Sequence, residues 1–280
     1  MIEELIENEM EYFKPMLERQ KLVNKETRMV WKDETVAQRL QRISIETYDL
    51  CKGKVCSGLF KGLKLNKNTW WGKSDLGSQC LGLYEKEILN LLENKSPFDT
   101  FLDVGAADGY YAVGMLHSKL AKKSICFEVS NEGRLAIRKN WLSNKRIGEL
   151  EIYGEANESS ITKITSKMNT KSLVLIDIEG SEFALLTPNV ISMLKEFEII
   201  IEIHNWVDNF SSRYKTLLLN LFEHFEIKPI TRVVRCTEQI PLLRSYTDDN
   251  RLLLASEQRP CLMRFLHLVP HNKFDPLVTQ

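Results

Sequence analysis

From Phe98 onward, short apolar segments alternate with amphipathic segments, and this alternation constrains the fold more than any other feature of the 280-residue chain. The first five expected strands are 100–104, 124–129, 150–153, 172–178 and 198–204. Most of the stretches between them are near the roughly dozen residues that a crossover between parallel strands needs. After a helix around 213–225, "IKPITRVVR" (227–235) and "CLMRFLHLV" (261–269) are expected to be two more strands. The pattern predicts an α/β fold with a doubly wound, mostly parallel sheet and helices on both faces.

The first 75 residues have a different rhythm and are expected to form an N-terminal helical extension or cap. Apolar residues recur at helical spacing in 2–17, where Pro15 should end or kink the helix, and again after Asp33. "CSGLFKGLKL" (56–65) is expected to be a short strand or hairpin. The N-terminal helices could cap the core, cover the active site or pair with another subunit, so a homo-oligomer is one of the expected outcomes.

Composition narrows the partners. Lys plus Arg and Asp plus Glu number 38 each, so the formal net charge is zero and no broad electrostatic footprint for nucleic acid is indicated. No apolar run approaches the roughly 18 residues of a membrane span. The acidic start "MIEELIENEM" lacks the layout of a secretory signal, and six cysteines without a CxxC pair favour free thiols. We therefore expect a cytoplasmic protein that acts without a membrane.

The segment "FLDVGAADG" (101–109) places Asp103 at the end of the first strand of the alternating run. Gly105 permits a tight turn, and Gly109 lets the next helix start close to the strand. The spacing is not that of a phosphate-binding GxxxxGK[ST] loop, and Ala107 replaces the middle glycine of the dinucleotide fingerprint. An acid before such a loop suits a ligand with an ammonium or sulfonium group. S-adenosylmethionine carries both.

The second strand supports the same ligand. "SICFEVSNEG" carries Glu128 at its tip, 19 residues after Gly109. An acid at about this distance accepts hydrogen bonds from both ribose hydroxyls of a nucleoside cofactor. The alternative is that Glu128 is a solvated strand end.

The fourth strand introduces a second group of acids. "SLVLIDIEGSEFALL" runs from apolar residues into Asp177, Glu179 and Glu182. Asp177 should point into the ligand crevice, because the fourth strand lies beside the first in the usual winding. Glu179 and Glu182 are candidates for substrate contact. They could instead cap the following helix, since acids favour helix N-termini.

The fifth strand ends with "EIHNW", in which Glu202 and His204 share one face of the sheet. His204 could take a proton from an attacking hydroxyl near neutral pH. Alternatively, a divalent ion could lower the pKa of that hydroxyl, held by Asp177, Glu202, His204 and Asn205. Asn205 is also a candidate for substrate contact.

Two further groups of residues leave alternatives open. Trp70 and Trp71 could stack on a sugar ring or a base, or could anchor the core. Six arginines between 232 and 264 could clamp an acidic substrate. Acids interleave with these arginines, which favours a solvated loop instead.

In their order along the chain, "LGLYEKEI", "FLDVGAADGYYAVG", "FEVSNEGRLAIRKN", "IYGEA", "LVLIDIEGSE" and "IIIEIH" resemble the FkbM-type S-adenosylmethionine-dependent methyltransferases. The resemblance covers about 80 to 206. It implies a Rossmann-like class I methyltransferase fold, in which a seven-stranded sheet ends in an antiparallel strand. We expect a cofactor-binding methyltransferase domain over 76–280 that follows the N-terminal extension over 1–75. Asp108 departs from the family, where Asn precedes the glycine.

The resemblance implies roles for individual residues. The first loop would hold the cofactor through Asp103, Gly105, Ala106, Gly109 and Tyr110. Ribose and adenine would contact Glu128, Val129, Glu155 and Ala156, while Asp177 would approach the methionine end and Tyr84 and Glu85 would close over it.

Most members of the family methylate hydroxyls of sugars and other natural products. We therefore expect O-methylation of a small molecule, sugar or glycan, with Asp177 or His204 as the base. The alternatives are a methyltransferase for an RNA cap or ribose, and a binding module for the cofactor without catalysis.

Overall fold

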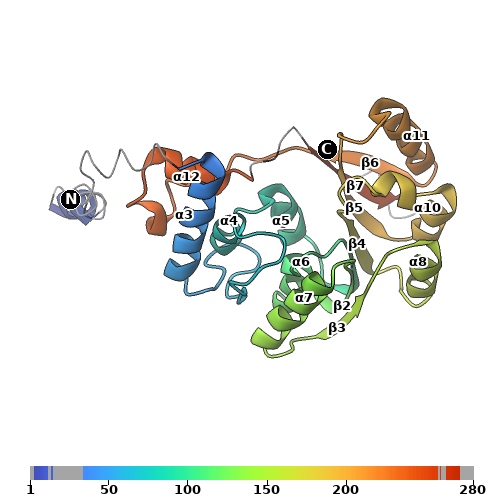
Figure 1. The fold of residues 1–280 in the computed structure, drawn as a ribbon, viewed down its shortest axis with the longest axis horizontal. Helices are drawn as coiled ribbons and strands as arrows, with labels where there is room; N and C mark the ends of the chain where they lie inside the picture. Colours follow the sequence, from blue (N-terminus) through green and yellow to red (C-terminus); the bar gives the residue numbers. More distant parts are fainter. Residues whose placement is uncertain (1–2, 12–13, 15–33, 258, 260–262, 272–280) are drawn as a thin grey trace.

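The computed structural model describes residues 3–11, 14, 34–257, 259 and 263–271. Seven strands of the described chain form one sheet in the order β3-β2-β1-β4-β5-β7-β6 (Figure 1). The strands are β1 (Phe98–Val104), β2 (Ala121–Phe127), β3 (Glu149–Tyr153), β4 (Ser172–Ile176), β5 (Glu198–Ile203), β6 (Phe225–Ile230) and β7 (Arg264–Pro270). Strands β1 to β5 pair in parallel, and β7 lies antiparallel between β5 and β6. This strand order confirms the predicted class I methyltransferase fold.

Helices cover both faces of the sheet, as a parallel sheet requires. Figure 1 shows α5 (Lys86–Glu93), α6 (Tyr110–His117) and α7 (Asn131–Ser143) on one side. The other side carries α8 (Glu158–Thr165), α10 (Pro188–Leu194) and α11 (Phe210–Phe222), with the short α9 (Glu182–Leu185) after β4. Each side encloses its own apolar cluster.

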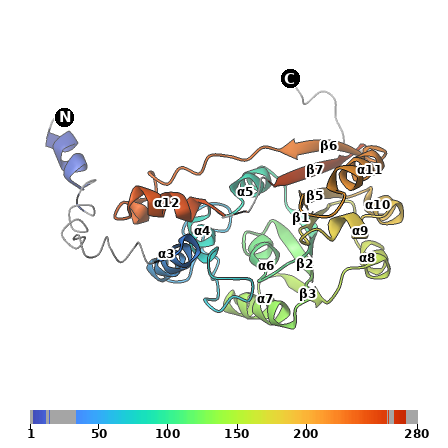
Figure 2. The same ribbon diagram turned by 45° about the horizontal axis from the view of Figure 1, so that its top comes forward.

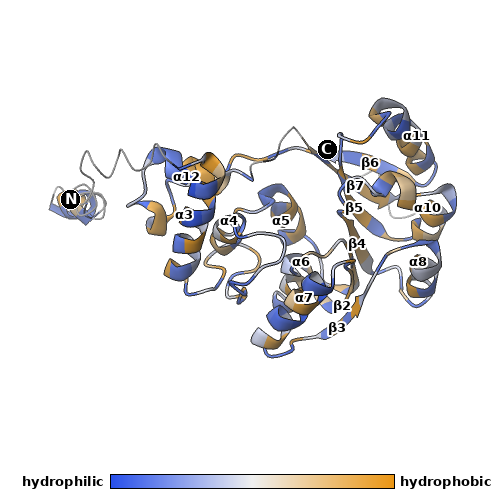
Figure 3. Ribbon diagram, viewed as in Figure 1, coloured by the Kyte–Doolittle hydropathy of each residue, from blue (hydrophilic) through white to orange (hydrophobic). Residues whose placement is uncertain are grey.

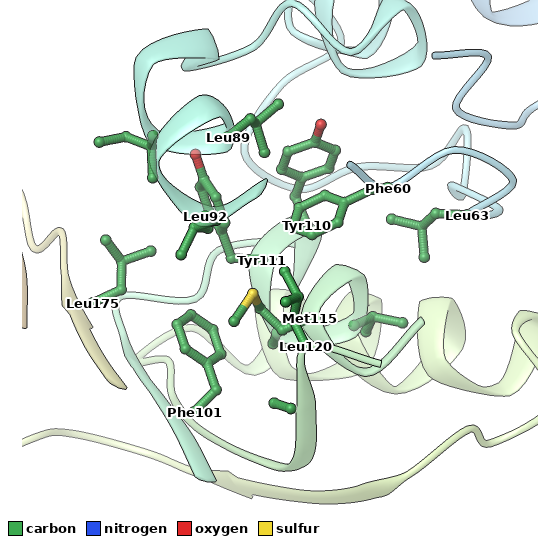
Figure 4. Close-up of a cluster of buried hydrophobic side chains, with 14 of the residues drawn as sticks. Phe60, Leu63, Leu89, Leu92, Phe101, Tyr110, Tyr111, Met115, Leu120 and Leu175 are labelled. Carbon is green, nitrogen blue, oxygen red and sulfur yellow. The ribbon is translucent and has the colours of Figure 1, made fainter. Parts of the chain in front are cut away.

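Strand β4 shows why the sheet is buried on both faces. All five of its residues are buried. Leu173 and Leu175 belong to the cluster under α5 and α6, and Val174 and Ile176 to the cluster under α8 and α10. This division follows from the two-residue period of a strand. Figure 3 shows the central strands β4 and β5 mainly in the hydrophobic colour, and Figure 4 shows Phe101 and Leu175 facing the helix side chains.

The strands differ at their ends from the sequence-based prediction. Strand β2 was expected to end at residue 129, strand β4 at residue 178 and strand β5 at residue 204. In the structure these strands end at Phe127, Ile176 and Ile203, respectively. Strand β6 begins two residues earlier than expected and ends at Ile230 rather than at 235. The parallel strands stop where glycine or charged residues begin, because the chain turns there and backbone pairing ends.

The segment 236–260, expected to be a solvated loop, contains ordered structure, and that expectation was wrong. It includes a 3-10 turn η1 (Pro241–Leu243) and α12 (Asp248–Ala255). Helix α12 lies beside α3 (Val36–Leu50) and α4 (Leu76–Leu81) in both views (Figures 1 and 2). A third apolar cluster joins these helices through Leu40, Leu81, Tyr246 and Leu254. Helix α12 has only eight residues, and charged residues lie between its apolar ones, so its helical pattern was not recognised in the sequence.

The segment 56–65 forms turns rather than a regular strand, with a single bridge between Lys54 and Lys64. Its Phe60 ring packs against α6, where a Cβ added at Gly114 would come within 2.6 Å of it. Residues 3–11 are helical, as expected, and their Leu5, Ile6 and Met10 side chains are exposed. The rest of the first expected helix, including Pro15, lies outside the described residues apart from position 14, so pairing through these helices stays a prediction. Among the described residues, no helix combines the length and apolar character that crossing a membrane requires.

Candidate active site

A cavity of about 660 Å³ lies where β1, β2 and β4 end. Val104 pairs with Phe127 and with Ile176, so Gly105, Glu128 and Asp177 follow these strands at one level. Ile176 pairs with Ile201, which places Glu202 of β5 level with Asp177. The cavity is lined by most of the predicted site residues: Trp70, Trp71, Tyr84, Glu85, Asp103, Gly105, Ala106, Tyr110, Glu128, Val129, Glu155, Ala156, Asp177, Glu179 and Glu202. Among the predicted residues, Gly109, Glu182, His204 and Asn205 are not part of this lining.

The turn after β1 requires glycine at Gly105. Its φ is +96°, and an added Cβ would come within 1.7 Å of the carbonyl oxygen of Asp177. The Asp177 amide in turn donates to the Val104 carbonyl at 2.9 Å. The loops after β1 and β4 are therefore in backbone contact. Gly109, with φ of +81°, is the N-cap of α6 and lets that helix begin beside the turn.

Asp103 is the most buried acid of the first loop. Its side chain accepts the Ala112 amide in the first turn of α6, but its Oδ2 has no hydrogen-bond partner among the described residues. Burial, with a contribution from the charge of Asp177, raises the pKa of Asp103 to about 8. A cationic ligand group at Oδ2 would satisfy this oxygen and favour its charged form.

Glu128 joins the first two loops of the site. Its Oε2 accepts the Ala107 amide at 2.9 Å, and its Oε1 accepts the Ser130 amide at 2.7 Å. Each carboxylate oxygen has a second lone pair, which can accept a hydroxyl hydrogen. Burial raises the pKa of Glu128 despite these two amides. The side chain is 5% exposed and lines the cavity, so it is not a solvated strand end.

Asp108 anchors the tryptophan segment over this end of the cavity. Its two oxygens accept the amides of Trp70 at 2.9 Å and Trp71 at 3.3 Å. Asn140 of α7 adds a second link, because it donates to the Asp108 carbonyl and accepts the Asn66 amide. Both tryptophans are partly exposed and line the cavity, so they are not core anchors. Neither contact was predicted from the sequence, where Asp108 is only a departure from the FkbM-type pattern and Asn140 carries no recognisable signal.

Arg259 occupies the opposite end of the cavity. Its guanidinium contacts Glu85 at 2.9 Å and Glu257 at 2.8 Å, and it also pairs with Glu202. Burial raises the pKa of Glu85 to about 8, although the charge of Arg259 opposes the shift. Glu85 also accepts the Tyr111 hydroxyl at 2.7 Å. This role of Arg259 was not predictable from the sequence, because its partner Glu85 lies 174 residues away and no local pattern marks the pair.

Glu202 and Asp177 form a carboxyl pair deep in the site. They hydrogen-bond to each other, and the pKa of Glu202 is raised to about 11 by burial, Asp177 and Glu85. The raised pKa favours the protonated form of Glu202, which can donate to Asp177. Burial also raises the pKa of Asp177, while Glu202, His204 and Arg259 oppose the rise.

His204 lies behind Asp177 and is fully buried. Its Nδ1 is 3.2 Å from both oxygens of Glu182, which is fully buried and also accepts the His204 and Gly180 amides at 2.9 Å. Burial alone would lower the pKa of His204, but Glu182, Asp177 and Glu179 outweigh that effect and raise it. Glu182 thus orients His204 and has no surface for substrate. Asn205 is exposed and points outside the cavity lining.

Comparisons with known proteins give likenesses at the level of the fold. No family model matches the chain, and no curated protein matches it. TrmK from M. capricolum, solved with S-adenosyl-homocysteine, is 12% identical at a TM-score of 0.42, with 68% of this chain and 69% of that chain covered. An O-methyltransferase from Bacillus cereus in complex with SAH is 12% identical at a TM-score of 0.44, with 67% of this chain and 80% of that chain covered. A putative rRNA-methylase from Clostridium thermocellum is 10% identical at a TM-score of 0.44, with 68% of this chain and 97% of that chain covered. At such values the fold assignment rests on the strand order of this chain itself.

Proposed function

We propose that this chain is an S-adenosylmethionine-dependent methyltransferase that methylates a hydroxyl of a small molecule, sugar or glycan, in the manner of the FkbM-type enzymes. The observation that carries the proposal is the arrangement of Asp103, Glu128 and Asp177 around one cavity at the carboxyl edge of a class I sheet. Ligands of doubly wound folds bind at this edge. The cavity has the size range of cofactor sites.

Acidic residues at two ends of the cavity would bind the cofactor. The ribose hydroxyls would donate to Glu128, with Trp70 beside it and Val129 and Ala156 against the adenine. The ammonium and sulfonium groups would face Asp103, whose Oδ2 has no hydrogen-bond partner among the described residues, and Asp177. Tyr84 and Glu85 would close this end, where Tyr84 and Tyr110 pack with ring centroids 5.6 Å apart.

The chemistry needs little beyond alignment and removal of one proton. When bound, S-adenosylmethionine would supply the methyl group to the acceptor oxygen, and S-adenosylhomocysteine would be the leaving group. The acceptor hydroxyl loses its proton at the Asp177 end, because Asp177 and Glu179 line the cavity there. His204 reaches the acceptor only through them, since it is fully buried. Aligning the acceptor and excluding water supply most of the rate enhancement in such a site.

Isothermal titration calorimetry with the cofactor-stripped chain tests the cofactor. We expect binding of both S-adenosylmethionine and S-adenosylhomocysteine, with roughly tenfold weaker binding of S-adenosylmethionine to Asp103→Asn, which keeps the size but loses the charge. Glu149→Gln, an exposed carboxylate at the start of β3, is a matched control and should bind as wild type. Absence of heat with both compounds would contradict the proposal.

Methyl transfer from labelled S-adenosylmethionine to fractionated cell extract tests the acceptor class. Label in a small-molecule or glycan fraction that is stable to ribonuclease supports the proposal. Label that is lost on ribonuclease treatment would instead identify an RNA methyltransferase. Cofactor binding without transfer to any fraction would identify a binding module.

A further inference from the structure

We propose that Asp177, Glu179 and His204 form a binding site for one divalent transition-metal ion. The His204 Nε2 lies 3.5 Å from Asp177 Oδ1 and 3.7 Å from Glu179 Oε2. One ligand atom from each of the three residues lies within 4.8 Å of the other two. The three side chains come from the loop after β4 and the end of β5, so the sheet holds them together.

The evidence beyond the cluster itself is a buried nitrogen aimed into it. His204 is 0% exposed, and its Nε2 has no hydrogen-bond partner in the described part of the chain. The same holds for Asp177 Oδ1, the carboxylate oxygen that faces it. Leaving such a buried group without a partner destabilises the folded state. A cation between the two atoms would satisfy both.

Glu182 presents the imidazole as a metal ligand. Its two oxygens lie 3.2 Å from Nδ1, so the Nδ1 hydrogen is directed to Glu182 and Nε2 faces the acids. A buried carboxylate that holds the far nitrogen of a histidine in this way is the usual outer partner of a metal-bound imidazole. The Trp206 ring, with its centroid 4.8 Å from that of His204, covers the imidazole.

The separations suit ligands of one ion. Two ligand atoms that lie about 2.1 to 2.5 Å from an ion at a right angle are about 3.0 to 3.5 Å apart. The observed 3.5 and 3.7 Å are close to the upper end of this range. Small side-chain movements would complete the coordination, and Glu179 is free to make them because its side chain is 49% exposed.

The backbone at Glu179 favours the same conclusion. Its φ is +53°, a left-handed conformation that residues other than glycine seldom adopt. Such a conformation is energetically unfavourable and is found most often at functional sites. Here it directs the carboxylate toward His204.

A second triad, Glu85, Asp177 and Glu202, also has ligand atoms within 4.8 Å of one another. Arg259 already pairs with Glu85 and Glu202, so the chain itself supplies the cation of this triad. Asp177 and Glu179 have no arginine or lysine partner among the described ion pairs. Among the described residues, the part of the cavity where only His204, and no arginine or lysine, faces the acids is therefore the His204 end.

One imidazole with two carboxylates favours Mn²⁺ or Zn²⁺ over Ca²⁺, because nitrogen ligands are preferred by transition metals. The site does not depend on the methyl transfer proposed above. If both are present, an ion at Asp177 would lower the pKa of the acceptor hydroxyl at the point where its proton must leave.

Binding of Mn²⁺ alone tests the site, with electron paramagnetic resonance of the full chain after removal of metals by chelation. We expect a single bound Mn²⁺, and roughly tenfold or greater weakening in Glu179→Gln, whose half-exposed side chain is not needed for folding. His204→Gln should abolish binding, and Glu223→Gln, an exposed acid after α11, should leave it unchanged.

Three outcomes would overturn the site: no bound Mn²⁺, binding that Glu179→Gln and Asp177→Asn leave unchanged, or equal affinity for Ca²⁺ and Mn²⁺. Calorimetry with S-adenosylhomocysteine in the presence of chelator separates this result from the proposed function. Cofactor binding without Mn²⁺ binding removes only the metal site. Mn²⁺ binding without cofactor binding removes only the methyltransferase.

Discussion

The Asp108 carboxylate accepts the Trp70 amide at 2.9 Å, and this contact ties a segment from the N-terminal part of the chain to the loop between β1 and α6. Trp70 in turn lies against the start of α7, where a Cβ added at Gly133 would come within 2.1 Å of its indole nitrogen. The tryptophan segment is therefore part of the wall of the site.

Replacement of Asp108 should loosen that wall. In Asp108→Ala the amides of Trp70 and Trp71 lose their acceptor. Each lost hydrogen bond should destabilise the docked tryptophan segment by about 1 to 3 kcal/mol. We expect the dissociation constant for S-adenosylhomocysteine to rise about tenfold, measured by calorimetry. Asp108→Asn keeps one acceptor oxygen and should lose less. Equal affinity of Asp108→Ala and wild type would show that the segment does not contribute to the site.

Gly105 should tolerate no side chain. In Gly105→Ala the new Cβ would meet the Asp177 carbonyl at 1.7 Å, and a φ of +96° is strained for alanine. We expect at least about 3 kcal/mol lower free energy of unfolding and loss of cofactor binding. Gly154→Ala is the matched control, since the nearest atom to its Cβ lies 4.0 Å away. Urea unfolding compares the two, and a stable Gly105→Ala variant that binds cofactor would refute the geometry of this turn.

Glu182 should stabilise the fold through His204. The Glu182 carboxylate accepts hydrogen bonds from the Gly180 amide, the His204 amide and His204 Nδ1. Glu182→Gln replaces one of its two acceptor oxygens by an amide group, which cannot accept from these donors. Breaking a buried charged contact costs about 3 kcal/mol. We expect this drop in the free energy of unfolding by denaturant titration. Glu155→Gln, an exposed acid, should change it by less than about 0.5 kcal/mol. A similar small change in Glu182→Gln would rule out the positioning role.

Glu198 should make stability depend on acid pH. Burial raises the pKa of Glu198, but the hydrogen bond from His267 at 2.5 Å and the contact with Lys95 outweigh it, so the pKa lies below 4.5. A lowered pKa contributes stability above 4.5 that is lost as the pH falls through the folded-state value. Glu198→Gln should therefore cost about 1 kcal/mol at neutral pH and progressively less below pH 4.5. Urea unfolding at neutral pH and below pH 4.5 measures this cost. The same cost at both pH values would contradict a lowered pKa of Glu198.

Strand-tip residues were predictable because they depend on local order along the chain. The alternation of strands and helices predicts the sheet and places Asp103, Glu128 and Asp177 at one edge of it. The order of the strands in the sheet decides which strand ends lie next to each other. The doubly wound pattern allows only a few such orders. Strand ends were less predictable, because the last pairs depend on the neighbouring strand.

The amino-acid sequence by itself determined the fold class and the first acids of the cavity, because period, strand tips and glycine turns are local properties. Only the tertiary structure decided that Arg259 pairs with Glu85 and Glu202, that Asp108 holds the tryptophan segment, and that Glu182 contacts the imidazole of His204. These contacts join residues that are 22 to 174 positions apart. Nothing in the neighbouring sequence marks them, since burial and the pairing of charges arise only when the helices and loops have packed around the sheet.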